Sequence, residues 1–193
     1  MVFGTILTSG QEVPVDTSSS ATGVATFALN EEGTALNYSL TVDGLDFGAF
    51  IGNGTPQTEN TFDDVLGIDL GNAPPGETGD VAFGIVGLGQ DDDLMFVSNP
   101  DGSTTISGTW AENDLASIPL STFIPGIQSA AATTAESGAV QITDLYLNVR
   151  TAGYPEGAIR GQMASISPEL SEWLLTADPI VLNGLIGQYI PPI

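Results

Sequence analysis

The chain of 193 residues contains no cysteine, no histidine and no lysine, and its only basic residues are Arg150 and Arg160. Without cysteine, the chain can form neither disulfide bonds nor thiolate metal sites. Without histidine, it lacks the most common transition-metal ligand and the most common general base. We therefore expect no transition-metal cofactor and no enzymatic activity, because neither histidine nor lysine is present to activate a hydroxyl group.

Against the two arginines stand 24 acidic residues, which give a net charge of −22 at pH 7. Such a surface repels nucleic acid and anionic lipid, so neither is expected as a partner. No run of about 18 apolar residues is present, so no membrane insertion is expected. The acidity either keeps the chain in solution or binds cations, and calcium is the cation that carboxylates and carbonyls bind best.

The chain contains 24 glycines and 12 prolines, and these turn-forming residues separate short runs in which apolar and polar residues alternate. This pattern is typical of short β-strands joined by turns. The clearest run is 35–42, where every second residue from Leu36 to Val42 is apolar. The turns are too short for parallel crossovers, so the sequence predicts an all-β fold, an antiparallel two-sheet sandwich. The other expected strands are residues 2–8, 21–29, 65–70, 80–86, 94–98, 103–110, 145–150 and 157–164.

Two stretches depart from this pattern. Residues 117–132 carry apolar residues at helical spacing interrupted by Pro125, which predicts one or two short helices on the flank of the sandwich. After the domain of residues 1–164, residues 165–193 form an apolar C-terminal extension that begins with a helix-start signal at Ser167-Pro168-Glu169. The extension either packs on its own domain or docks on a neighbouring subunit. Its expected anchors for assembly are Trp173, Leu174, Tyr189 and Ile190.

Asp91, Asp92 and Asp93 form the densest run of charge in the chain. Adjacent carboxylates repel one another unless a cation or solvent screens them. With Asp101 near the far end of the next turn, they form a candidate calcium site, although the spacing differs from that of an EF-hand. The alternative is an acidic turn exposed to solvent.

Two motifs near the end of the domain carry a resemblance to a known family. They are Leu-Tyr-Leu-Asn-Val-Arg-Thr at 145–151 and Gly-Ala-Ile-Arg-Gly-Gln at 157–162. Because of these two motifs and an opening motif, the chain resembles the CHRD (chordin-like) domain family over residues 3–164. The resemblance implies an immunoglobulin-like or superoxide-dismutase-like Greek-key sandwich and a secreted or cell-surface location. A secretion signal is then expected to be absent from this chain. The opening motif consists of Leu7, Gly10, Glu12, Val13 and Pro14.

The chain departs from the family where the resemblance implies histidines. Asp69 and Gly71 replace a His-x-His pair, and Arg150 replaces the histidine of an Asn-Val-His-Thr segment. Arginine is a fixed cation and not a metal ligand, so we expect Arg150 to pair with Asp69. The alternative is that both are solvated surface charges. Glu12 of the opening motif and Arg160 of the closing motif form a second candidate pair, which would tie the two ends of the domain together.

These features suggest two functions. The first is a non-enzymatic extracellular structural protein, a self-associating building block of a sheath, surface layer or filament whose assembly calcium assists. This function predicts a homo-oligomer or polymer. The second is an extracellular binding module that captures a protein or glycan ligand, as the resemblance to chordin-like proteins implies.

Overall fold

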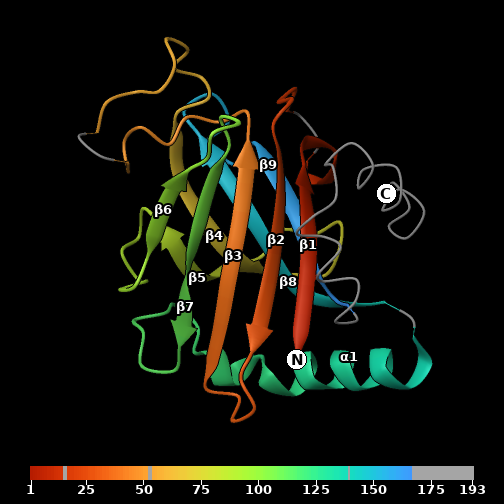
Figure 1. The fold of residues 1–193 in the computed structure, drawn as a ribbon. Coiled ribbons are helices and arrows are strands. Elements are labelled where there is room, and N and C mark those ends of the chain that lie inside the picture. The colour runs from red at the N-terminus through yellow and green to blue at the C-terminus, as the bar shows by residue number, and fades with distance from the viewer. Residues whose placement is uncertain (15–16, 52–53, 139, 167–193) are drawn as a thin grey trace.

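The computed structural model describes residues 1–14, 17–51, 54–138 and 140–166. The described residues form nine β-strands, two short 3-10 segments and one α-helix (Figure 1). The strands are β1 (Val2–Thr8), β2 (Thr22–Leu29), β3 (Ala35–Asp43), β4 (Val65–Asn72), β5 (Asp80–Val86), β6 (Met95–Ser98), β7 (Thr104–Ala111), β8 (Gln141–Thr151) and β9 (Ile159–Ser165). The helical segments are η1 (Ser9–Gln11), η2 (Leu120–Thr122) and α1 (Ile124–Ser137).

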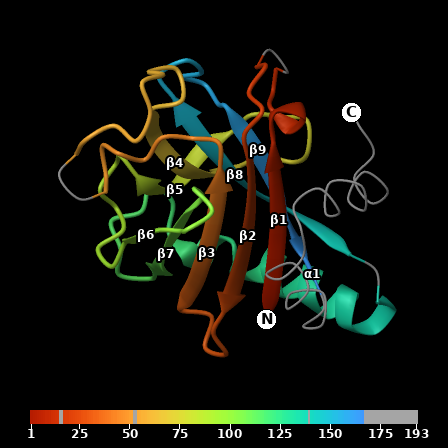
Figure 2. The ribbon, with the colours of Figure 1, turned by 45° about the horizontal axis from the view of Figure 1, so that its top comes forward.

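The nine strands form one antiparallel sheet in the order β5-β4-β8-β9-β1-β2-β3-β7-β6. The sheet curls so that its two halves face each other (Figures 1 and 2). Phe83 of β5 stacks on Trp110 of β7 across the interior, with ring centroids 5.1 Å apart. The predicted all-β antiparallel class is confirmed. The two layers are halves of one sheet, because β1 pairs with β9 on one side and with β2 on the other.

The core lies between the two halves of the curled sheet. Side chains alternate along each strand, so that on β3 Leu36 and Leu40 are fully buried while Asn37 is exposed. Burial of apolar surface is the main stabilising term for such a core. The largest fully buried side chains are Trp110, Phe3, Phe27, Phe47 and Phe83.

Helix α1 crosses one open end of the curled sheet (Figure 1). The sequence predicts that Pro125 interrupts the helical stretch, but the structure places Pro125 in the first turn of α1, where a missing N–H costs nothing. Phe123 precedes the helix and packs on Trp110, with centroids 5.6 Å apart, and Ile127 is buried. Gly138, at φ 70°, ends the helix by donating to the Thr134 carbonyl. Among the described residues, no helix is long and apolar enough to span a membrane.

The last described strand extends one residue past the strand expected at 157–164. Strand β9 continues through Ser165, which pairs with Phe3 of β1. Ile166 is buried, and its N–H donates to the Val2 carbonyl at 3.3 Å. The predicted assembly anchors Trp173, Leu174, Tyr189 and Ile190 lie outside the described residues, so their role stays a prediction.

Candidate functional site

Six polar side chains lie on the outer face of β4, β8 and β9, and we call them the polar layer. Because Ile68 and Leu70 point into the core, Asp69 between them points to the opposite face. The layer is covered by two loops, residues 9–14 after β1 and residues 73–79 after β4. The Thr78 hydroxyl donates to the Val13 carbonyl where these loops meet. The members are Glu12, Asp69, Tyr146, Arg150, Arg160 and Gln162, and all except Arg150 are buried.

Asp69 and Arg150 form the expected ion pair. Nε of Arg150 donates to Oδ2 of Asp69 at 2.7 Å. The Asp69 side chain is 6% exposed, whereas that of Arg150 is 30% exposed. The pair joins β4 to β8 at the positions where the family resemblance implies histidines. It is therefore a charged cross-strand contact in which the carboxylate is buried and the guanidinium is partly exposed.

Burial and the contact with Arg150 shift the pKa of Asp69 in opposite directions. Burial raises the pKa of Asp69, while the hydrogen bond and the charge of Arg150 lower it, and the net shift is upward. Oδ1 of Asp69 is buried and has no hydrogen-bond partner. The arginine therefore compensates only part of the cost of burying the carboxylate.

Two glycines of β4 make room for the side chains on either side of Asp69. Gly67 lies opposite Arg150 in the register of β4 and β8. Gly71 lies opposite Tyr146 in the same register. A Cβ on Gly67 would overlap Nη2 of Arg150, and a Cβ on Gly71 would overlap the phenol ring. The guanidinium and the phenol therefore lie directly on the β4 backbone.

Arg160 occupies the centre of the polar layer. Its guanidinium carbon lies 3.5 Å from the centroid of the Tyr146 ring, in cation–π geometry. Nη2 donates to the Glu77 carbonyl at 2.7 Å. Burial lowers the pKa of Arg160, and the electrostatic effects of the neighbouring Tyr146 and Glu12 act in the opposite direction. Glu12 is thus close enough to influence the charge of Arg160. Arg160 itself contacts the loop after β4 through the Glu77 carbonyl.

Tyr146 and Gln162 are members of the polar layer that the sequence analysis missed. Nε2 of Gln162 donates to the carbonyls of Ala73 and Thr143, at 2.9 and 2.8 Å. The Tyr146 hydroxyl lies 3.3 Å from both the N–H and the carbonyl of Gly79. Both residues stand in the family-like motifs at positions that alternate with core residues, and this alternation was the available signal. Their contacts hold the loop after β4 against the sheet.

The Asp91–Asp93 run forms a second polar group, at the start of β6. The Tyr38 hydroxyl donates to Oδ2 of Asp91, and Oδ1 of Asp91 accepts from the Asp93 N–H at 3.0 Å. Oδ1 of Asp93 accepts from the Thr109 N–H at 2.7 Å. Burial raises the pKa of Asp91 to about 6, while Asp92 is exposed.

The structure does not bring Asp101 together with this run. Asp101 lies in the turn between β6 and β7, at the other end of the hairpin, where its carboxylate accepts from the N–H and hydroxyl of Ser103. These hydrogen bonds lower the pKa of Asp101. Within the described part of the chain, no three acidic side chains are grouped so as to hold a metal ion.

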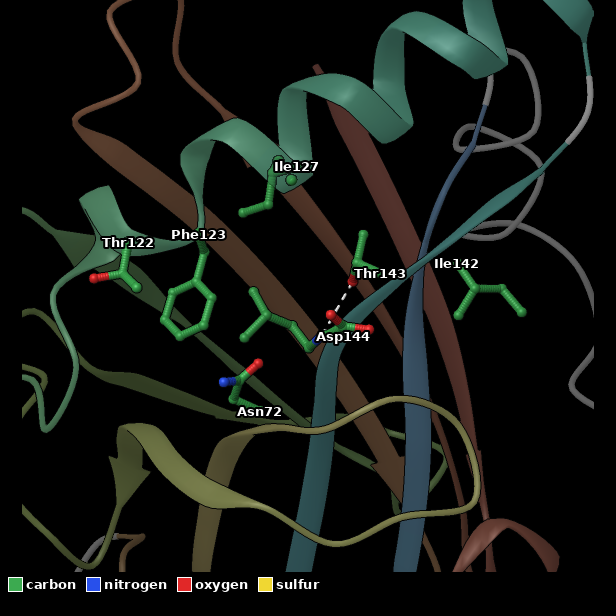
Figure 3. Close-up of a pocket in the computed structure, with 9 residues that line it drawn as sticks. Asn72, Thr122, Phe123, Ile127, Ile142, Thr143 and Asp144 are labelled. Carbon is green, nitrogen blue, oxygen red and sulfur yellow. Dashed lines mark hydrogen bonds between the residues drawn. The ribbon is translucent and has the colours of Figure 1, made fainter.

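A cavity of about 350 Å³ lies between α1 and β8 (Figure 3). Phe123 and Ile127 line it from the helical side, and Thr143 and Asp144 line it from β8. Asp144 is the only titratable group among the nine lining residues. The cavity can therefore receive a small apolar group next to a single carboxylate.

The curled antiparallel sheet and its polar layer define a β-rich module in which loops are tied over one sheet face by buried charged and amide groups. The chain belongs to the CHRD domain family, whose model matches residues 3–163. CHRD domains are non-enzymatic binding-type domains that occur in secreted proteins. No curated protein and no solved structure matches the chain.

Proposed function

We propose that this chain is an extracellular or cell-surface structural module that associates with copies of itself, as a building block of a sheath, surface layer or filament. One observation carries the proposal: the outer face of β2, β3, β7 and β6 bears no charged side chain except Asp43 at the end of β3. We call it the neutral face. Its residues are Thr22, Val24, Thr26, Ala28, Ala35, Asn37, Ser39, Thr41, Met95, Val97, Thr105, Ser107, Thr109 and Ala111.

The neutral face is rich in hydroxyl groups that bond to one another across the strands. The hydroxyls of Thr41 and Thr105 lie 2.9 Å apart, and the Thr109 hydroxyl donates to Oδ1 of Asn37 at 3.1 Å. These cross-strand contacts order the side chains before any partner arrives. Preordered side chains lose less conformational entropy on association.

Electrostatics favour this face for self-association. A chain with a net charge of −22 repels its own copies, and any contact between acidic surfaces brings carboxylates together. A contact through the neutral face keeps most carboxylates away from the interface. At physiological salt, charges separated by more than about 8 Å are then largely screened.

The polar layer supports the non-enzymatic part of the proposal. Asp69 is held by Arg150, and Arg160 is held by Tyr146 and the Glu77 carbonyl. Buried ionic groups with such fixed partners specify loop positions, and they offer no mobile proton to a substrate.

Calcium is proposed to assist association by screening the remaining carboxylates, of which Asp92 is an exposed example. The test is light scattering on the full chain after chelation, in titrations with sodium chloride and with calcium chloride at matched ionic strength. We expect mass to rise with ionic strength, and to rise further with calcium. A monomer under all conditions would overturn the structural proposal.

A pair of variants tests the use of the neutral face. Ser39→Asp places a carboxylate in the middle of this face, whereas Thr61→Asp adds the same charge to an exposed loop. We expect Ser39→Asp to reduce the associated mass and Thr61→Asp to leave it near that of the unmodified chain. Equal effects would show that net charge, and not the face, controls association.

The alternative function is a binding module for an extracellular protein or glycan, and the cavity beside α1 favours it. The ring of Phe123 and the side chain of Ile127 offer an apolar surface next to the polar groups of Thr122 and Asn72. Ligand sites commonly combine such surfaces. Under this alternative, the isolated chain stays monomeric at high salt.

A further inference from the structure

The two edges of the sheet differ in how well they are protected. At the β5 edge, the Gly84 N–H donates to the Gln90 side chain at 2.7 Å, and the Ala82 carbonyl accepts from the Ile118 N–H at 3.0 Å. At the β6 edge, nothing in the described part of the chain pairs with the outer side of the strand. An open edge presents unpaired N–H and carbonyl groups that can bind another strand.

The register of the β6–β7 hairpin identifies the groups at this open edge. The Asn99 N–H donates to the Ser103 carbonyl, so hydrogen-bonded pairs alternate from that point along the hairpin. Met95 and Val97 therefore direct their N–H and carbonyl groups toward β7. Phe96 and Ser98 direct theirs toward the free edge.

The side chains of β6 favour a lasting contact over a solvated edge. Phe96 points inward and stacks on Phe50, with centroids 5.8 Å apart, which holds the strand in place. Met95 and Val97 point outward and are 62% and 50% exposed. Charged residues and proline are among the features that protect natural edge strands, and the four residues of β6 include neither.

We propose that β6 pairs antiparallel with β6 of a second copy of this chain, with Val97 facing Val97 of that copy on the two-fold axis. This inference rests on the proposed self-association and adds a second contact, at the sheet edge, to the contact through the neutral face. Phe96 of each copy would exchange hydrogen bonds with Ser98 of the other. Val97 would form the closer, non-hydrogen-bonded pair, with Cα atoms about 4.5 Å apart. The two neutral faces would become one continuous surface.

This register also makes the contact dependent on salt. Counting outward from Val97, Asp93 of one copy lies level with Asp101 of the other, at both ends of the paired strands. Like charges opposite each other destabilise a strand pair. The carboxylates that one copy keeps at opposite ends of its hairpin are therefore brought together between copies, and ionic screening strengthens the contact.

A single cysteine tests the register directly, because the chain contains none. In Val97→Cys, the two thiols would lie within the Cα separation that a disulfide bridges, whereas Leu115→Cys places a thiol at a side chain that is 83% exposed elsewhere. Under mild oxidation at high salt, we expect Val97→Cys to form a disulfide-linked dimer about tenfold faster than Leu115→Cys. Equal rates would overturn the proposed interface.

Two further measurements separate this inference from the proposed function. Ser98→Pro removes an N–H from the free edge while leaving the ladder to β7 intact, so it should reduce associated mass without lowering the melting temperature greatly. Asp101→Asn should lower the salt concentration needed for association. If the unmodified chain associates but neither variant changes that association, the β6 interface is wrong and self-association stands. If the unmodified chain stays monomeric, both are wrong.

Discussion

Replacing Arg150 by methionine removes the cation that faces the buried carboxylate of Asp69 while keeping an aliphatic side chain over Gly67. The variant loses the 2.7 Å hydrogen bond from Nε, and it leaves a carboxylate with both oxygens unpaired, since Oδ1 already has no partner. Asp69→Asn is the matched variant on the other side of the pair. The asparagine carbonyl can still accept from Arg150, and no buried negative charge remains.

The structure sets the expected magnitudes of these changes. Removing one partner of a fully buried ion pair costs about 3–5 kcal/mol, and a charge-assisted hydrogen bond contributes about 1.5–3 kcal/mol. Because the Arg150 side chain is 30% exposed, solvent reaches the pair. We therefore expect Arg150→Met to lower the free energy of unfolding by about 2–3 kcal/mol at pH 7. The raised pKa of Asp69 shows that the fold already favours its neutral form, so Asp69→Asn should cost less than about 1 kcal/mol.

Denaturant unfolding at pH 7 and at pH 4 measures both effects. At lower pH, Asp69 takes up a proton and no longer needs a cation, so the deficit of Arg150→Met should shrink. The double variant should be close in stability to Asp69→Asn alone. Asp92→Asn, at an exposed position, serves as the control and should change little. A loss from Asp69→Asn as large as that from Arg150→Met, or a deficit independent of pH, would refute this reasoning.

Two other predictions concern the fold. Burial raises the pKa of Asp91 to about 6, so the folded state holds a proton that the unfolded chain releases near its ordinary pKa of 3.8. Stability should therefore fall as pH rises from 4 to 6, by about 1–2 kcal/mol after solvent screening, and unfolding of Asp91→Asn should lack this slope. Gly71→Ala would place a methyl group in the Tyr146 ring, so we expect a loss of about 1–3 kcal/mol. In Gly126→Ala, the added methyl group of α1 meets open space, so the free energy of unfolding should rise by up to about 1 kcal/mol in the same unfolding experiments. Equal effects of the two glycine substitutions would contradict the packing argument.

Local pattern was sufficient for most of the strands. The period of two along 35–42 and the turn residues around it placed β3 to within one residue, and β1 and β5 begin and end where expected. Strand β8 runs four residues further toward its start, to Gln141, because its first half pairs with β9 near the helix. Pairing of that kind depends on distant strands, and it leaves no mark in the local alternation.

The joining of the two layers into one sheet could not be predicted from the local sequence pattern. Whether β9 and β2 both pair with β1, and so join the two layers into one sheet, depends on which strands meet in space. Pro125 illustrates the same limit at a smaller scale. Proline breaks a helix interior but suits its first turn, and the choice depended on Phe123 packing on Trp110.

The candidate site was partly predictable because basic residues are scarce in this chain. With only two cations in the chain, a buried carboxylate had few partners, and the family resemblance placed Asp69 and Arg150 in corresponding positions. Tyr146 and Gln162 were missed because their roles arise from a loop that folds over the sheet. Asp101 was misplaced because closeness along the chain does not bring the two ends of a hairpin together.

The two outer faces of the sheet use the same alternation for opposite purposes. On β4, β8 and β9, the outward positions carry buried charges and amides, and two loops cover them. On β2, β3, β7 and β6, the outward positions carry mainly hydroxyl and small apolar groups, and Thr41 and Thr109 form hydrogen bonds across the strands. If acidity served only to keep the chain in solution, exposed strand positions would be the least costly places for carboxylates. The neutral face instead carries a single carboxylate, that of Asp43, and this scarcity supports a face that meets another copy, with the open β6 edge as the point where the two sheets join.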